Sequence, residues 1–447
     1  MIARGFGRLT DPPASFLLAG ARVVDPATGI DELRDIAVRD GVIVDLPADD
    51  LERIDASGLV VAPGFCDLHT HLREPGTEGE TVASGTRAAA RGGYTTVCAM
   101  PNTDPPLDES AAVAALLARA ADAACRVRVI AAATRGRAGH VPTELEALAT
   151  SGVVGVSDDG TGVPSERVVR EILKRLAPLD LPLIEHAEDG EAAGGGVMRV
   201  GPTATRLGLP AWPPEAEERM VERDLALAEA AGGRIHLTHL STAAAISAVR
   251  RARARGTRVT CDVTPHHFSM TDAWVGGSRR FAWEETSLVG TTGEPYDAAT
   301  RVNPPLATRE DALALLAAIE DGTVDAIATD HAPHPSHRKA VPFGEAAPGL
   351  VGLETALSLG LAAVEAGRLS LRRLVEALST APAEIIGERR GLPPGATADL
   401  VLFDPRARWQ VEPGALGSAS SNTPLLGMEL PGVVRMTVAS GRVTYRR

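Results

Sequence analysis

Two histidines separated by a single residue, His69 and His71, are the first residues of the chain whose types and spacing suggest a chemical role, the binding of a metal ion. Imidazole nitrogens are good zinc ligands, and residues i and i+2 of an extended segment point to the same side. The pair alone is a weak signal, because 11 histidines in 447 residues give about 0.27 such pairs by chance. Its meaning depends on which other side chains reach the same place.

Further side chains of metal-binding type follow apolar, strand-like runs later in the chain. Imidazole suits zinc, and a carboxylate can bridge two ions. A zinc site that keeps a position for water lowers the pKa of that water toward about 7, so the centre would supply a nucleophile at neutral pH. The residues concerned are Asp158, Asp159, His186, His239 and Asp330.

The elements that must position these residues alternate between strand-like and helix-like segments. Such alternation predicts a parallel sheet, and eight units predict an α/β fold of the (β/α)8 TIM-like barrel type, with its site at the carboxyl ends of the strands. An open doubly wound sheet is the alternative, but no Gly-x-Gly-x-x-Gly follows the first strand. The strands are expected at Val60–Cys66, Thr95–Met100, Arg126–Ala132, Val153–Ser157, Leu181–Glu185, Arg234–Thr238, Arg258–Val263 and Asp325–Thr329. Helices are expected at Glu78–Arg91, Glu109–Ala124, Ser165–Leu176, Glu215–Ala231, Thr242–Arg255 and Arg309–Asp321.

Both ends of the chain are rich in short β-like runs separated by turn residues, such as Phe16–Leu18 near the start and Val433–Ala439 near the end. Two such pieces can form one small sheet beside a central core. We therefore expect residues 1–62 and 389–447 to build a composite β domain, and residues 63–388 to form the metal-dependent barrel.

Composition excludes several classes of function. The formal net charge of −13 argues against nucleic acid or an anionic membrane as the main partner. No apolar run reaches the roughly 18 residues of a membrane span, and no signal peptide is recognisable, so a cytoplasmic location is expected. The four cysteines are scattered without a Cys-x-x-Cys pair, which favours buried thiols over disulfides or a thiolate zinc site.

A series of motifs in order along the barrel resembles the amidohydrolase superfamily, and dihydroorotases in particular. Together they span the whole predicted barrel, and the β segments at both ends resemble the small composite β domain of that family. The motifs are Val61-Ala-Pro-Gly-Phe-Cys-Asp-Leu-His-Thr-His-Leu-Arg-Glu-Pro-Gly76, Met100-Pro-Asn-Thr103, Ser157-Asp-Asp-Gly160, Glu185-His-Ala-Glu-Asp189, His236-Leu-Thr-His-Leu-Ser241, Val263-Thr-Pro-His-His267, Arg301-Val-Asn-Pro-Pro305, Ala328-Thr-Asp-His-Ala-Pro-His334 and Gly349-Leu-Val-Gly-Leu-Glu-Thr355.

The resemblance implies a centre of two zinc ions. Many relatives bridge the two metals with a carboxylated lysine, but the fourth-strand motif here contains no lysine. The bacterial dihydroorotases that the chain resembles use an aspartate instead. Its distance in sequence from His186 favours Asp159 as the bridge, with Asp158 as a supporting residue. One zinc is then assigned to His69, His71 and Asp330, and the other to His186 and His239.

The activity that the resemblance implies is reversible opening of L-dihydroorotate to N-carbamoyl-L-aspartate in pyrimidine synthesis. Asp330 would accept a proton from the attacking water and return it to the leaving nitrogen. Arg73, two residues past His71 on the same side of an extended segment, could bind the substrate carboxylate. The remaining substrate contacts are assigned by resemblance to Asn102, Asn303, His334, Pro348 and Gly349, with Pro348 standing where relatives often have an aromatic residue.

Two other functions are alternatives. An allantoinase or hydantoinase would share the barrel, but those relatives lack the arginine at position 73 and usually keep the bridging lysine. A non-catalytic partner of aspartate transcarbamoylase would typically have lost metal histidines. The resemblance also favours a homodimer and suggests an association with that transcarbamoylase. The long segment Trp274–Thr300 is interpreted as a mobile loop, either a lid over the substrate or a disordered insertion.

Overall fold

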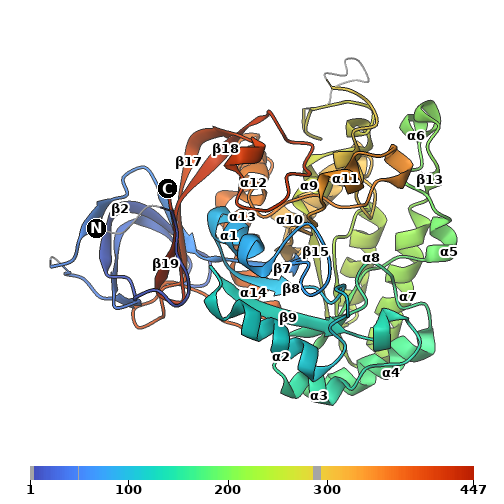
Figure 1. The fold of residues 1–447 in the computed structure, drawn as a ribbon, viewed down its shortest axis with the longest axis horizontal. Helices are drawn as coiled ribbons and strands as arrows, with labels where there is room; N and C mark the ends of the chain where they lie inside the picture. The colour runs from blue at the N-terminus through green and yellow to red at the C-terminus, as the bar shows by residue number, and fades with distance from the viewer. Residues whose placement is uncertain (1–4, 49, 285–292) are drawn as a thin grey trace.

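Eight parallel strands form the centre of the computed structural model, which describes residues 5–48, 50–284 and 293–447. Their order in the sheet is β16-β15-β14-β11-β10-β9-β8-β7, and a parallel bridge between Thr70 and His331 joins the two edges. The sheet is therefore a nearly closed barrel, which confirms the predicted fold class (Figure 1). The strands are β7 (Phe65–Thr70), β8 (Tyr94–Ala99), β9 (Arg126–Ala132), β10 (Gly155–Ser157), β11 (Pro182–Glu185), β14 (Arg234–Leu237), β15 (Val259–Val263) and β16 (Ala326–Ile327).

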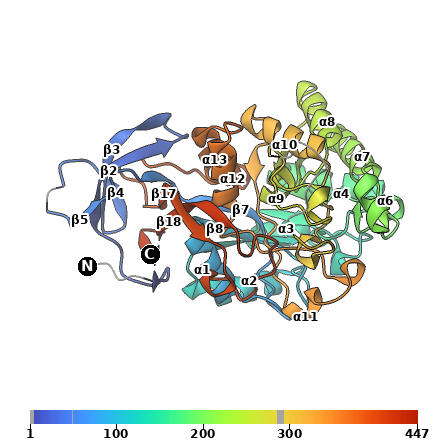
Figure 2. The same cartoon turned by 90° about the horizontal axis from the view of Figure 1, so that it is seen from above.

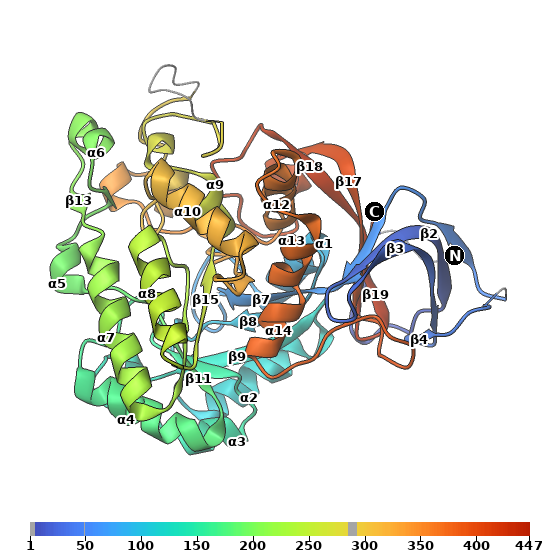
Figure 3. The same ribbon diagram turned by 180° about the vertical axis from the view of Figure 1, so that it is seen from behind.

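Helices cover the outside of the barrel, and Figure 3 shows α4, α7, α8 and α10 along one side of it. The predicted helices are present, and Glu215–Ala231 has the expected bounds. The outer helices are α1 (Val82–Gly92), α2 (Ser110–Arg119), α3 (Leu145–Thr150), α4 (Glu166–Leu176), α7 (Glu215–Ala231), α8 (Ala243–Ala254), α10 (Arg309–Glu320), α12 (Ala356–Glu365), α13 (Leu371–Leu378) and α14 (Thr380–Ile385). Short elements follow several strands, namely α5 (Gly190–Ala193), β12 (Met198–Arg199), α6 (Pro202–Leu207), β13 (Ala211–Trp212), α9 (Pro265–Ser269) and α11 (Ser336–Lys339).

Helix α7 shows how the sequence sets such boundaries. Pro214 precedes it, and three glutamates in its first turn complement the positive end of the helix dipole. The helix ends at Gly232, whose φ of 67° is a left-handed conformation that glycine adopts without a steric cost. Its buried face, which includes Met220, Val221 and Leu225, packs between α4 and α8.

The interior of the barrel is filled by a separate apolar cluster, so the barrel is a packed core and not a pore. The strands therefore act as a rigid platform for the side chains at their carboxyl ends. The buried residues of this cluster are Leu68, Cys98, Met100, Ile130, Ile184, Ala326, Ala328 and Ile385.

A second sheet combines strands from both ends of the chain. The N-terminal strand β6 pairs antiparallel with the C-terminal strand β17, and Figures 1 and 2 show the two termini together on this side of the molecule. The order is β1-β19-β18-β17-β6-β2-β3-β4, with β5 beside β2. The strands are β1 (Gly5–Phe6), β2 (Phe16–Asp25), β3 (Ile30–Arg39), β4 (Val42–Val44), β5 (Arg53–Asp55), β6 (Val60–Pro63), β17 (Leu400–Gln410), β18 (Glu429–Ala439) and β19 (Arg442–Arg446).

The prediction of one strand over Val60–Cys66 is wrong, because this run contains two strands of different sheets. Residues 60–63 form β6 of the small sheet, while β7 begins at Phe65 and pairs with β8 of the barrel. The change falls at Gly64, where a Cβ atom would lie 2.2 Å from the Thr95 side chain. As a consequence His69 lies within β7 and not after it.

The four cysteines are all buried free thiols, as predicted. In the segment predicted to be a mobile loop, the described part from Trp274 to Glu284 folds around the buried Trp274 indole, which stacks on Phe281 and donates from Nε1 to Arg280 O at 2.7 Å. Residues 285–292 of that segment lie outside the described residues, so its role as a lid or as an insertion remains a prediction.

Candidate metal centre

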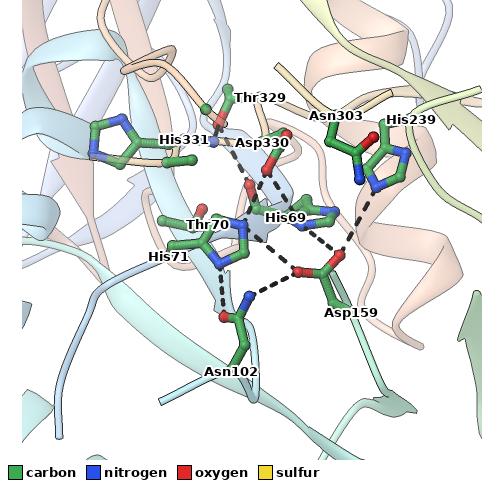
Figure 4. A network of polar contacts seen from close by, with 12 residues as sticks. His69, Thr70, His71, Asn102, Asp159, His239, Asn303, Thr329, Asp330 and His331 are labelled. Atoms are coloured by element: carbon green, nitrogen blue, oxygen red, sulfur yellow. Dashed lines mark hydrogen bonds and ion pairs between the residues drawn. The ribbon is translucent and has the colours of Figure 1, made fainter. Parts of the chain in front are cut away.

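Six of the side chains singled out in the sequence meet at the carboxyl end of the barrel, and Figure 4 labels all of them except His186. Each lies at the end of a strand or within three residues beyond it, where a (β/α)8 barrel places its active site. All six are buried, so none is a solvated surface group. They are His69 in β7, His71 after β7, Asp159 after β10, His186 after β11, His239 after β14 and Asp330 after β16.

The carboxylate of Asp159 lies at the centre of this group. Its Oδ1 atom faces three imidazoles, at 3.2 Å from His69 Nε2, 3.6 Å from His186 Nδ1 and 3.8 Å from His239 Nε2. Its Oδ2 atom lies on the side of His71, 3.7 Å from Nε2. The carboxylate therefore lies between the pair His69 and His71 and the pair His186 and His239, where it could bridge two cations.

Asp330 completes the second group of ligand atoms. Its Oδ1 atom lies 3.0 Å from His71 Nε2 and 3.5 Å from His69 Nε2. Two sets of potential ligands thus share His69, one with His71 and Asp330 and the other with Asp159 and His239, and the atoms of each set lie within 4.8 Å of one another.

Hydrogen bonds behind the imidazoles direct their inner nitrogens toward the centre. His69 Nδ1 donates to Thr238 Oγ1 at 2.9 Å, and the Thr238 hydroxyl donates in turn to Asp262. His71 Nδ1 donates to Asn102 Oδ1 at 2.8 Å. These bonds place the lone pair of each Nε2 atom inward, which is the tautomer that binds metal, and such outer contacts are a usual part of metal sites.

His186 is oriented the other way round. Its Nε2 atom lies 3.0 Å from Glu188 Oε2, which leaves Nδ1 facing Asp159. Glu188 also accepts a hydrogen bond from Asn303 Nδ2 at 2.7 Å. Sequence reasoning missed Glu188, although it stands in the motif that contains His186 and could have been noticed there.

The residues present fit a metal ion. His69 Nε2 is buried and forms no hydrogen bond within the described part of the protein, while carboxylate oxygens of Asp159 and Asp330 lie 3.2 Å and 3.5 Å from it. Burial would lower the pKa of the His69 and His186 imidazoles, but nearby carboxylates outweigh it and raise these pKa values to about 9 and about 10. The same contacts hold the pKa of Asp159 well below its usual range despite burial. A cation would replace these imidazole protons, since ligands bind metal in their deprotonated form.

The two neighbouring aspartates after β10 point in different directions. Asp158 Oδ1 accepts from the Thr134 backbone N–H at 2.9 Å, and the Thr134 hydroxyl donates to its other oxygen. Asp159 instead reaches the histidines and accepts from Asn102 Nδ2 at 3.0 Å. The geometry therefore brings Asp159 to the centre and leaves Asp158 as a buried anchor of the adjoining loop.

Backbone strain is concentrated around the centre. His239 and Asp330 have φ values of 40° and 46°, and Arg73 has a φ of 61°. Residues other than glycine seldom adopt this left-handed region, and each such conformation costs of order 1–3 kcal/mol. The surrounding hydrogen bonds hold these residues in place, as at many sites built for function.

Four of the residues predicted to bind substrate lie next to one another beside the centre, and we call them the substrate wall. They are Arg73, His334, Pro348 and Gly349. Arg73 is largely enclosed and donates from Nε to Pro333 O at 3.1 Å. His334 donates from Nε2 to Pro348 O at 2.8 Å, and burial together with the Arg73 guanidinium lowers the pKa of His334 to about 3. Gly349 has a φ of 127°, and an added Cβ would lie 2.5 Å from the Ala332 side chain, so only glycine fits.

The remaining two substrate candidates have partners within the site. Asn102 links His71 to Asp159, and Asn303 contacts Glu188, which contacts His186, so both support candidate metal ligands. A cavity of about 940 Å³ opens next to His334 and is lined in part by Arg279, Lys339 and Asn422.

Sequence comparisons with known proteins agree on one family. Residues 58–245 match the family described as Dihydro-orotase-like. A curated dihydroorotase of Anaeromyxobacter dehalogenans is 46% identical over 437 residues, covering 96% of this chain and 97% of its own. A dihydroorotase of Geobacter metallireducens is 42% identical, covering 97% of this chain and 100% of its own.

Solved structures place the fold among cyclic amidohydrolases. The L-hydantoinase (dihydropyrimidinase) of Arthrobacter aurescens has a TM-score of 0.81 and 25% sequence identity, with 96% of each chain covered. The dihydropyrimidinase of Brevibacillus agri has a TM-score of 0.80 at 24% identity, covering 97% of this chain and 95% of its own, which is a likeness of fold. Because the full-length curated relatives are 40% identical or more, this chain belongs to the dihydroorotase family of cyclic amidohydrolases.

Proposed function

We propose that this chain interconverts L-dihydroorotate and N-carbamoyl-L-aspartate at a centre that binds two zinc ions. The observation that carries the proposal is the position of Asp159, whose carboxylate lies within 3.8 Å of a ring nitrogen from each of the four histidines. His69, His71 and Asp330 would hold one ion, His186 and His239 the other, and Asp159 would bridge them. Nitrogen and oxygen ligands of this kind suit zinc. Zinc would supply Lewis acidity and lower the pKa of a water molecule toward neutrality.

Asp330 is the proposed general base and acid. Burial would raise the pKa of Asp330, but His69 and His71 outweigh it and keep the carboxyl ionised. The carboxylate can therefore accept a proton as the oxygen of water bonds to the ring amide carbon. When the carbon–nitrogen bond breaks, the same proton passes to the leaving nitrogen. Asp330 therefore ends the reaction in the same ionised form in which it began.

The wall beside the centre is proposed to bind the rest of the substrate. The Arg73 guanidinium would pair with the substrate carboxylate, with Asn102 and His334 as further contacts. The low pKa of His334 keeps its imidazole uncharged at neutral pH, and its one N–H is used by Pro348 O, so the ring would contact the substrate without donating to it. Asn303 and the backbone at Pro348 and Gly349 would contact the ring amide groups.

A substrate panel tests the proposal against its alternatives. The metal content of the purified protein is measured first by elemental analysis, and two zinc ions per chain are expected. Hydrolysis of dihydroorotate, allantoin and dihydrouracil is then compared. We expect turnover of dihydroorotate alone. Zinc without dihydroorotate turnover would contradict the proposal, and turnover of allantoin or dihydrouracil would favour the allantoinase or hydantoinase alternative.

Assembly and location are proposals that rest on family resemblance. We propose a cytoplasmic homodimer that associates with aspartate transcarbamoylase. Among the described residues, no helix is long and apolar enough to cross a membrane. Light scattering of the purified chain, alone and mixed with the transcarbamoylase of the same organism, tests both assemblies. A monomer that shows no change in mass on mixing would contradict them.

A further inference from the structure

A segment from the C-terminal part of the chain reaches the wall of the site. The connection between β17 and β18, drawn in red in Figure 1, extends from the small sheet over the barrel. Within it, the backbone N–H of Gly417 donates to Glu354 at 2.9 Å, and that of Ala419 donates to Glu80 at 3.0 Å. The Ser420 hydroxyl donates to Gly79 O at 2.6 Å. Hydrogen bonds to Glu354 and to residues 79–80 therefore fix this segment to two different parts of the barrel.

Asn422 in this segment joins two loops of the site. Its Oδ1 atom accepts from the backbone N–H of His334 at 3.0 Å. Its Nδ2 atom donates to the carbonyls of Ala332 at 3.0 Å and Gly349 at 3.1 Å. Its own carbonyl accepts from Val351 N at 3.0 Å. One side-chain amide thus uses its acceptor and both of its donor hydrogens to bind the backbone on either side of the wall.

The contacts of Asn422 are directed at the substrate wall and not at the metal ligands. His334 and Gly349, which it holds, are candidates for binding substrate, and the metal-ligating side chains are held by other residues such as Thr238 and Asn102. The three hydrogen bonds of this amide fix both the distance between the two loops and their relative orientation, because one acceptor and two donors must be matched at once. Loss of the donors would leave backbone carbonyls without their partner.

We propose that Asn422 is a positioning residue that sets the spacing between His334 and Gly349 and so determines affinity for substrate. This inference rests on the proposed dihydroorotase activity. It assigns a role at the site to the C-terminal segment, which lies outside the barrel in sequence. Displacement of a substrate contact by about 1 Å can reduce catalytic efficiency about a hundredfold, so a small shift of these loops would be measurable.

Two substitutions test the proposal. Asn422→Asp keeps the acceptor for His334 N and nearly the same shape, but it cannot donate to Ala332 O or Gly349 O. Asn422→Ala removes all three side-chain bonds. For both variants we expect the KM for dihydroorotate to rise about tenfold or more, with kcat within about threefold of the wild-type value and with unchanged zinc content. Calorimetry should show N-carbamoyl-L-aspartate binding weakened by a similar factor.

The control is Ser421→Ala, a change of the adjacent residue that leaves the amide in place, and its KM should equal that of the wild type. A KM within twofold of wild type in either folded variant would overturn the proposal. So would a loss of kcat or of zinc with KM unchanged, or failure of both variants to fold, because each points to a purely structural role. Failure of the proposed function itself is recognised separately, as a zinc-loaded wild-type chain that does not turn over dihydroorotate.

Discussion

Asp67 binds Thr329 twice across the closure of the barrel, through the Thr329 backbone N–H at 2.8 Å and its hydroxyl at 2.6 Å. Asp67 lies in β7 two residues before His69, and Thr329 immediately precedes Asp330. The first and last strands of the barrel thus meet through a buried carboxylate next to the metal centre. These two bonds hold a ligand from each strand in register.

Replacing Asp67 by alanine should weaken both folding and metal binding. The substitution leaves the Thr329 donors unsatisfied in a buried position, which costs about 1–3 kcal/mol for each group. It also loosens the pairing of His69 with Asp330, and loss of such an outer contact lowers metal affinity about 10- to 100-fold. Thermal unfolding and zinc titration of the variant measure the two effects. Wild-type zinc affinity in a destabilised variant would show that the closure does not position the ligands.

Asp159→Asn and Asp158→Asn should differ in kind although the residues are adjacent. Asp159 faces the histidines, so its variant should lose zinc and more than about a hundredfold in kcat/KM, beyond the cost of an outer contact. Asp158 binds Thr134, so its variant should keep zinc and lose about 1–3 kcal/mol of unfolding free energy. Elemental analysis and urea denaturation distinguish them. The reverse pattern would assign the bridge to Asp158.

Asp330→Asn should retain most of the bound zinc while losing turnover. The amide oxygen can still occupy the position 3.0 Å from His71 Nε2, but an amide cannot accept the proton of the attacking water. General acid–base catalysis contributes about a hundredfold to ten-thousandfold, and kcat should fall by such a factor. Steady-state kinetics on protein of known zinc content measure it. Unchanged kinetics would remove Asp330 from the proton transfer.

How far the sequence predicts this molecule depends on the range of the interactions involved. Short continuous apolar runs indicate strands that are buried on both faces. Because these runs alternate with helix-like segments, the barrel could be predicted. The same signal cannot show a change of pairing partner, so it predicts a single strand over the run from Val60 to Cys66. The meeting of the candidate ligands could be predicted because a barrel brings all its carboxyl strand ends together. Asn422 could not, because it contacts His334 across 88 residues and belongs to no strand end.

The pH dependence of stability should reveal Lys339, which lies against the segment that carries Asn303. Its Nζ atom donates to the carbonyls of Ala298 at 3.0 Å and Arg301 at 3.2 Å. Burial and the Arg301 charge lower the Lys339 pKa from 10.5 to about 7, although Asp297 opposes them. Between these two values the unfolded chain binds a proton that the folded chain does not, so the contribution of Lys339 to unfolding free energy rises with pH.

Lys339→Met tests this sign. The unfolding free energy of the wild type relative to the variant should increase from pH 7 to pH 10, measured by urea denaturation at several pH values. Lys174, the only other lysine of the chain, is exposed on α4 and provides the matched control, because its replacement by methionine should leave the pH dependence unchanged. Parallel curves for wild type and Lys339→Met would show that the lysine keeps its ordinary pKa in the folded protein.

Substitution of Arg73 tests whether the site is built for a carboxylated ring. Its guanidinium can form two parallel hydrogen bonds with a carboxylate, whereas a lysine ammonium presents a point charge in another position. Hydrogen bonds to charged groups contribute about 1.5–3 kcal/mol, so Arg73→Gln should raise the KM for dihydroorotate about 10- to 100-fold, and Arg73→Lys should recover only part of this. Zinc content should stay at the wild-type value, since Arg73 is not a ligand. Calorimetry with N-carbamoyl-L-aspartate is the second test. If the glutamine variant binds this compound as tightly as the wild type, another residue recognises the carboxylate, and a preference for dihydroorotate over hydantoinase substrates does not come from Arg73.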